Sequence, residues 1–223
     1  MLQQEQVEPF VVRDCALVAM ATGRRAQTLK ELRDQLREVE DVSIYHHFWG
    51  RLLQPQFDEP EYNNDFAAWA FYHLHHQELA ERLSVVNPSE FATIDEVRDE
   101  LVEIVETVLD ESEVMAYTRA DTPFHFVKSQ IVVFDTGLSL KRPEELADVV
   151  PQMSSGNIFY HFIDARRRTP MSRDDFSAWL EGYGEKYRDL LDALGAIDPY
   201  FSSLEEIRSI LSGTFERFLK GSE

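Results

Sequence analysis

The sequence holds one cysteine, Cys15, among 223 residues. A single cysteine cannot form a disulfide within the chain, and it supplies too few thiolates for a zinc ribbon or a similar metal site. The longest apolar run, residues 15–21, is far too short to cross a bilayer, and the first ten residues lack the basic and apolar segments of a signal peptide. We therefore expect a soluble cytoplasmic protein without a redox role.

Basic residues are scarce relative to acidic ones. The chain has 22 lysines and arginines against 41 aspartates and glutamates, which gives a formal net charge of -19. Such a field repels phosphate backbones and anionic lipid surfaces, so we expect neither nucleic acid nor a membrane as a partner. Glycine-rich phosphate loops and dinucleotide fingerprints are also missing from the sequence. We predict no cofactor, and the sequence leaves open whether the chain is an enzyme.

What the sequence does contain is an internal repeat. Residues 10–48 align with residues 124–162 without a gap, and ten of the 39 pairs are identical. Unrelated segments of this length would share about two or three. The match resumes where NNDFAAW, residues 63–69, lies over RDDFSAW, residues 173–179. A tandem duplication explains matches that recur in register.

The repeat predicts the domain organisation and the fold class. We expect a first repeat unit over residues 1–117 and a second over residues 118–223, fused in one globular body. Each unit predicts one strand followed by several helices, so the fold class is α+β and helix-rich. Two related strands could pair across a pseudo-twofold axis, and the molecule would then be one pseudo-twofold body.

Local patterns place the elements within each repeat. Residues 124–137 are rich in β-branched and aromatic side chains and end at a glycine suited to a turn, which predicts a strand. Thr28 predicts the start of a helix because Glu31, three residues on, completes a capping box. Ser43 and Asn157 are good N-cap residues and predict the starts of two equivalent helices.

The ends of the two repeats also correspond. Each repeat has a break before a proline, at Asn87-Pro88 and at Asp198-Pro199. Apolar residues at helical spacing then follow in both, which predicts a final amphipathic helix in each repeat.

Three motifs resemble those of a bacterial family known only as a domain of unknown function. They are SIYHHF at residues 43–48, FDEPEYNNDFAAW at residues 57–69 and NIFYHFIDARRR at residues 157–168. The resemblance covers nearly the whole chain. It implies no activity, cofactor or catalytic residue.

The paired histidines His47 and His161 are equivalent under the repeat and have two interpretations. Each could pack beside a phenylalanine and hydrogen-bond a backbone carbonyl, as buried histidines usually must. Alternatively, both could converge on one cleft, where a neutral imidazole acts as an acid, a base or a metal ligand. In that case Arg51 and Arg166 would line the cleft and attract an anionic or sugar-phosphate ligand.

Two other groups of residues are weaker candidates for chemistry. His73 and His76 could share a helix face, a spacing that metal sites use, but no third ligand follows at a recognisable spacing, so we predict no metal site. Cys15 and its equivalent Ser129 each precede a paired histidine by 32 residues, as a nucleophile and base could. The simpler interpretation is that both are small residues in a crowded strand.

Charge also distinguishes the two repeats. Residues 57–65 are rich in carboxylates, whereas the matching segment contains Arg166, Arg167 and Arg168. These segments could face each other, within the molecule or across a dimer, or the acidic segment could simply be a solvated loop.

Two classes of function remain. The first is a non-catalytic interaction or regulatory protein that binds a protein partner or a second copy of itself. The second is a small-molecule-binding protein or enzyme with its site between the two repeat units.

Overall fold

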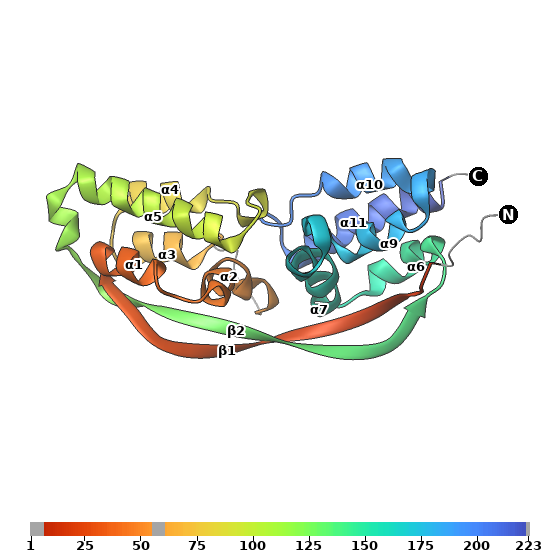
Figure 1. The fold of residues 1–223 in the computed structure, drawn as a ribbon, viewed down its shortest axis with the longest axis horizontal. Helices are drawn as coiled ribbons and strands as arrows, with labels where there is room; N and C mark the ends of the chain where they lie inside the picture. The colour runs from red at the N-terminus through yellow and green to blue at the C-terminus, as the bar shows by residue number, and fades with distance from the viewer. Residues whose placement is uncertain (1–6, 55–60, 222–223) are drawn as a thin grey trace. The chain divides into compact units, whose positions relative to one another are not determined.

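The protein forms a two-stranded antiparallel ribbon combined with many short helices. The computed structural model describes residues 7–54 and 61–221. Strand β1 covers Phe10–Thr28 and strand β2 covers Arg119–Leu140, and the two pair with each other (Figure 1). The predicted class, α+β with helix in excess, is confirmed for this part of the chain.

By its contacts the chain divides into two compact units whose boundaries lie inside the strands. Unit 1 consists of Met1–Ala16 and Ile131–Glu223, and unit 2 consists of Leu17–Gln130. These boundaries differ from those of the predicted repeats. The aromatic packing shows why: Phe10 of β1 stacks on Phe176, and Phe124 of β2 stacks on Phe66. The opening part of each strand therefore packs with helices that follow the other strand.

Unit 2 packs its helices on the ribbon through apolar faces. Phe124 and Phe126 of β2 are buried there. The break at Asn87-Pro88 is confirmed, because Asn87 caps a new helical turn that starts at Pro88. The final amphipathic helix of this unit is also confirmed, with Val97, Leu101, Val105 and Val108 buried. The elements are α1 (Leu29–Leu36), α2 (Asp41–Trp49), η1 (Gly50–Leu53), α3 (Asp65–Tyr72), α4 (Gln77–Ser84), η2 (Pro88–Glu90), α5 (Ile94–Glu111) and η3 (Glu113–Ala116).

In its described residues, unit 1 is divided into more helical segments than unit 2. Its last helix, α11 (Leu204–Leu219), buries Leu204, Ile207, Leu211 and Phe215 as predicted. One turn, η6 (Phe159–Asp164), is a π-helix. The other elements are η4 (Pro143–Glu145), α6 (Leu146–Val149), η5 (Val150–Gln152), α7 (Ser155–Ile158), α8 (Ala165–Arg168), η7 (Pro170–Ser172), α9 (Asp175–Glu181), η8 (Gly184–Tyr187) and α10 (Arg188–Gly195).

The expected turn at the end of each strand is wrong. Gly23 and Gly137 do adopt positive φ angles, 78° and 71°, but the strands continue past them. Beside each glycine a threonine hydroxyl bridges the ribbon: Thr22 Oγ1 donates to the carbonyl of Phe126 at 2.7 Å, and Thr136 Oγ1 donates to that of Val12 at 2.6 Å. The glycine therefore bends a continuing strand, as glycines inside strands often do.

The predicted N-caps at Ser43 and Asn157 are also wrong. Helix α2 begins at Asp41, and helix α7 is capped by Ser154, whose hydroxyl accepts from the N–H of Asn157. Thr28 does cap α1, but the carboxylate of Glu31 reaches back to the N–H of Gln27. Ser43 and Asn157 lie inside their helical turns, where the hydroxyl of Ser43 and the Nδ2 atom of Asn157 bond the ribbon.

Candidate functional site

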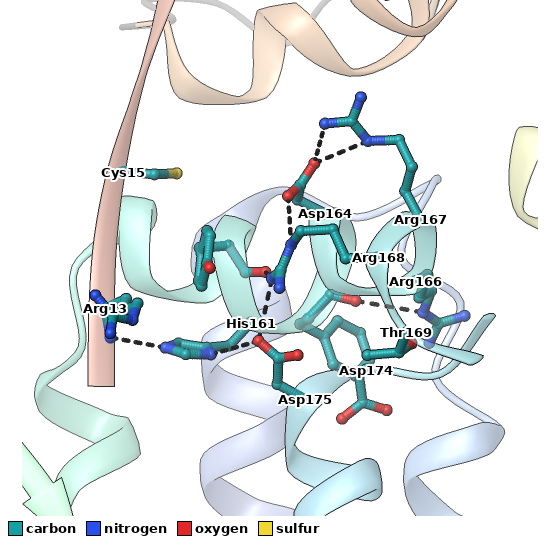
Figure 2. Close-up of polar contacts among 12 residues, drawn as sticks. Arg13, Cys15, His161, Asp164, Arg166, Arg167, Arg168, Thr169, Asp174 and Asp175 are labelled. Atoms are coloured by element: carbon teal, nitrogen blue, oxygen red, sulfur yellow. Dashed lines mark hydrogen bonds and ion pairs between the residues drawn. The ribbon is translucent and has the colours of Figure 1, made fainter. Parts of the chain in front are cut away.

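His161 stands at the centre of a buried polar cluster in unit 1 (Figure 2). Its Nε2 atom accepts a hydrogen bond from the backbone N–H of Arg13 at 2.9 Å. Its Nδ1 atom lies 2.8 Å from Asp175 Oδ2, which also accepts from the guanidinium of Arg168 at 3.1 Å. The whole residue is 2% exposed. Both ring nitrogens are therefore engaged within the unit.

His47 has the same arrangement in unit 2. Its Nε2 accepts from the backbone N–H of Val127 at 3.1 Å, and its Nδ1 lies 2.8 Å from Asp65 Oδ2. Asp65 also pairs with Arg51 at 3.7 Å. Val127 and Arg13 are themselves related by the repeat offset, since 13 and 127 differ by 114 as 47 and 161 do.

These contacts fix the tautomer and limit the chemistry of both histidines. A nitrogen that accepts from a backbone N–H carries no proton, so Nε2 is bare and Nδ1–H donates to the aspartate. A histidine paired with an aspartate resembles the base of a catalytic triad. In a triad, however, Nε2 takes the proton of the nucleophile, whereas here a backbone amide occupies it. Neither histidine can act as a general base without breaking that bond.

Ser43 and Asn157 complete the contact with the strand. The hydroxyl of Ser43 donates to the carbonyl of Val127 at 2.8 Å, and the amide of Asn157 donates to the carbonyl of Arg13 at 2.8 Å. In each unit, two side chains four positions apart thus satisfy the N–H and the C=O of one strand residue. A ribbon of two strands leaves one edge of each strand unpaired, and buried backbone groups need partners. These side chains therefore cover part of a strand edge in each unit.

A tryptophan extends this cover in each unit. Trp69 Nε1 donates to the carbonyl of Thr122 at 2.8 Å, and Trp179 Nε1 donates to that of Glu8 at 2.8 Å. Sequence reasoning missed Asp65 and Asp175 as partners of the histidines. Their identity in the aligned segments NNDFAAW and RDDFSAW was the available signal.

The two predicted arginines take different positions. Arg51 lies beside the aspartate that holds His47, and Arg168 takes the corresponding place beside Asp175. Arg166 is separate from that cluster: its guanidinium lies over the ring of Phe162, 4.9 Å from the centroid, and its Nε donates to the carbonyl of Phe162 at 3.3 Å. The structure thus groups His47 with Arg51 in unit 2, and His161 with Arg168 in unit 1.

Asp164 is a buried carboxylate that binds two arginines of the basic run. It is 1% exposed and accepts from Arg167 Nε at 3.1 Å, from Arg167 again at 2.8 Å and from Arg168 Nε at 2.8 Å. The guanidinium of Arg168 also stacks on Tyr160 at 3.9 Å. Arg167 and Arg168 therefore have acidic partners in their own unit, and residues 57–60 of the predicted acidic segment lie outside the described residues.

Cys15 is buried and inert. Its thiol donates to the carbonyl of Gly156 at 3.3 Å, and burial, reinforced by Asp164 and Asp14, raises its pKa to about 12. A nucleophilic cysteine needs a lowered pKa. Cys15 also belongs to unit 1 with His161, whereas the sequence spacing paired it with His47.

The cluster at residues 73–76 does not form a metal site on one helix face. His73 ends α3, His75 adopts a positive φ of 56°, and the ring of His76 caps α4 by accepting from the N–H of Leu79. The segment is thus a turn between two helices. Within residues 7–54 and 61–221, no group of three or more potential ligands gathers around one point. In the same range, no helix is both long and apolar enough to cross a membrane.

Comparisons with known proteins identify the family of the chain. Residues 7–216 match the family of unknown function DUF5752, and the chain belongs to that family. A solved structure, that of OrfY from Thermoproteus tenax, is similar, with 30% sequence identity, a TM-score of 0.81 and 94% of each chain covered. Among curated proteins, none matches the chain. The expected family of unknown function is confirmed.

Proposed function

We propose that the chain is a non-catalytic interaction protein, built from two repeats of one strand-plus-helices unit, that binds a partner protein through its ribbon. We place it in the cytoplasm, with neither nucleic acid nor membrane as a partner. The observation that carries the non-catalytic role is the use of both ring nitrogens of His47 and His161 to hold the strands. A group that is fully hydrogen-bonded inside the fold has no free atom for substrate.

The matched contacts of the two histidines support the duplication. Helices of each repeat bond the strand of the other repeat, at Arg13 in one case and Val127 in the other. The threonine and tryptophan contacts follow the same offset of 114 at the strand residue. A pseudo-twofold relation between the repeats is part of the proposal.

Exposed apolar side chains on the strands support the binding role. In unit 1, Val11, Val133, Phe134 and Leu138 are between 41% and 49% exposed. Residues 129–134 carry no charge, although the chain as a whole carries -19. Apolar residues on an otherwise charged surface mark interaction sites. The occupant we propose is therefore a different protein that presents an apolar surface.

Site-specific photo-crosslinking tests this role. A benzophenone side chain replaces Phe134 in living cells, and the matched control carries it at Phe201, an exposed phenylalanine of the same unit outside the ribbon. We expect capture of one defined protein from position 134 only. With that protein purified, F134S should weaken its affinity about tenfold, since burying half a phenylalanine contributes roughly 1.5 kcal/mol, and F201S should not.

Three outcomes would overturn the proposal. Equal capture at both positions would mean that position 134 contacts nothing in particular. Equal affinity of the wild type and F134S for the captured protein would remove the ribbon from the interface. Capture of a second copy of this chain would replace a different partner by self-association.

The small-molecule alternative at the histidines has less support. It requires the ring nitrogens of His47 and His161 to face a ligand, but strand amides and aspartates occupy them. Arg51 and Arg166 do not share one environment either, because Arg51 pairs with Asp65 and Arg166 packs on Phe162.

A further inference from the structure

A cavity of about 410 Å³ lies within unit 1, and its lining includes neither His161 nor Asp175. This volume falls in the range of roughly 300–1,000 Å³ that is typical of small-molecule pockets. Helices α8, α9 and α10 and the segment between α8 and α9 supply its walls. Its polar lining consists of Arg166, Ser172, Arg173, Asp174, Ser177 and Asp192.

Arg166 brings unused hydrogen-bond donors to this cavity. Its Nε donates to the carbonyl of Phe162 at 3.3 Å, and within the described part of the chain its two terminal nitrogens have no acceptor. Burial lowers the pKa of its guanidinium, while Asp174 and Asp198 oppose that effect. A half-buried guanidinium with free N–H groups favours a carboxylate or another planar anion.

Asp174 brings a buried negative charge to the same cavity. Its residue is 3% exposed, and its two oxygens accept from the N–H of Ser177 at 2.9 Å and from the Ser177 hydroxyl at 2.7 Å. Burial raises the pKa of this carboxyl above its usual value. A cationic ligand group beside it would offset that burial. Asp192, which is exposed, adds a second carboxylate to the lining.

The backbone beside the cavity is strained. Met171 and Ser172, neither of them glycine, adopt consecutive positive φ angles of 64° and 53°. Such conformations are unfavourable for residues other than glycine and gather at ligand sites. Here they place Ser172 in the cavity wall.

The corresponding position in unit 2 carries a different side chain. Asn64, which aligns with Asp174, uses its Oδ1 to cap α3 and its Nδ2 to donate to the carbonyl of Leu83 at 3.0 Å. An aspartate cannot make the second bond because an ionised carboxylate has no donor. Ala67, which aligns with Ser177, offers no hydroxyl either. The replacement of Asn by Asp thus introduces a charge that the shared fold does not need.

We propose that this cavity binds a free α-amino acid, with its carboxylate on the Arg166 guanidinium and its ammonium group on Asp174 and Asp192. The lining has two arginines and two aspartates, and Arg173 already pairs with Glu181. The carboxylate of a zwitterion can pair with Arg166, and its ammonium group can pair with the two aspartates. A doubly charged phosphate would instead be repelled by both aspartates. This ligand site goes beyond the protein-binding role and does not depend on it.

Saturation-transfer NMR on the full chain, with each proteinogenic amino acid in turn, tests the proposal. An amino acid that gives a signal is then titrated by calorimetry against three variants. R166Q should weaken binding by about tenfold or more, because a charge-assisted bidentate contact is lost. D192N, at an exposed position that a fold tolerates, should weaken it by a smaller factor. The matched control is R188Q, which removes an exposed arginine of α10 that does not line the cavity.

Inorganic phosphate serves as the competing probe in the same experiment. Binding of phosphate without binding of any amino acid would overturn the assignment of the ligand class. Absence of binding by every probe would overturn the site itself. Amino-acid binding that survives both R166Q and D192N would locate the ligand elsewhere and would also overturn the proposal.

Discussion

Replacing His161 by phenylalanine should destabilise unit 1 by about 3 kcal/mol. The new ring retains most of the packing, since His161 lies 4.8 Å from Phe10 and 5.8 Å from Phe176 between ring centroids. The substitution removes two hydrogen bonds. The backbone N–H of Arg13 loses its acceptor, which costs roughly 1–3 kcal/mol for a buried group, and Asp175 loses one donor, worth about 1 kcal/mol, while keeping Arg168.

The measurement is urea unfolding followed by far-UV circular dichroism at neutral pH. H161Q should lose about 1 kcal/mol less than H161F, because an amide can offer an acceptor to Arg13 and a donor to Asp175. The control is H125Q, at an exposed histidine of β2, which should stay within about 0.5 kcal/mol of the wild type. A loss below about 1 kcal/mol for H161F, or equal losses for H161F and H161Q, would refute the strand-holding role of the ring.

Three further predictions concern the division into units, one glycine and the cysteine. A fragment of residues 17–130 should fold alone, with helical circular dichroism and a cooperative transition, whereas residues 1–117 should not fold as a monomer; the reverse result would contradict the unit boundaries. Gly156→Ala should cost more than 1 kcal/mol in urea, because a Cβ there would lie 2.5 Å from the carbonyl oxygen of Cys15, while Gly213→Ala, with open space around it, should stabilise helix α11 by up to about 1 kcal/mol; equal effects would exclude the close approach. Cys15, whose pKa burial raises to about 12, should react with a thiol reagent at pH 8 only after denaturation, and rapid labelling of the native chain would show that the thiol is accessible.

The final helices of both units and one helix cap could be predicted from the sequence because they depend on local patterns. Thr28 caps its helix as the pattern required, and Leu204 to Phe215 form the expected apolar stripe. The role of the histidines could not be predicted in the same way. The alignment identified His47 and His161 as equivalent, but their partners, Val127 and Arg13, are backbone amides, and a backbone amide leaves no signature in the sequence.

The exchange of strand partners between the repeats could not be predicted for a reason of symmetry. Val127 and Arg13 occupy equivalent positions in the two repeats. The alignment is therefore consistent with His47 bonding the strand of its own repeat and equally with His47 bonding the strand of the other repeat. Strand length would have decided the matter. A strand of 19 residues, such as β1, extends about 60 Å at roughly 3.3 Å per residue.

A compact unit of about 100 residues has a radius of gyration near 13 Å, so its diameter is well under that length. One unit cannot cover such a strand, and the remainder must either stay exposed or pack with a second unit. The sequence prediction stopped the strand at its glycine, after 14 residues, and thereby hid this constraint. Because Gly23 bends β1 without ending it, the strand is long enough to serve both units, and the paired histidines are the side chains that hold its edge and that of β2.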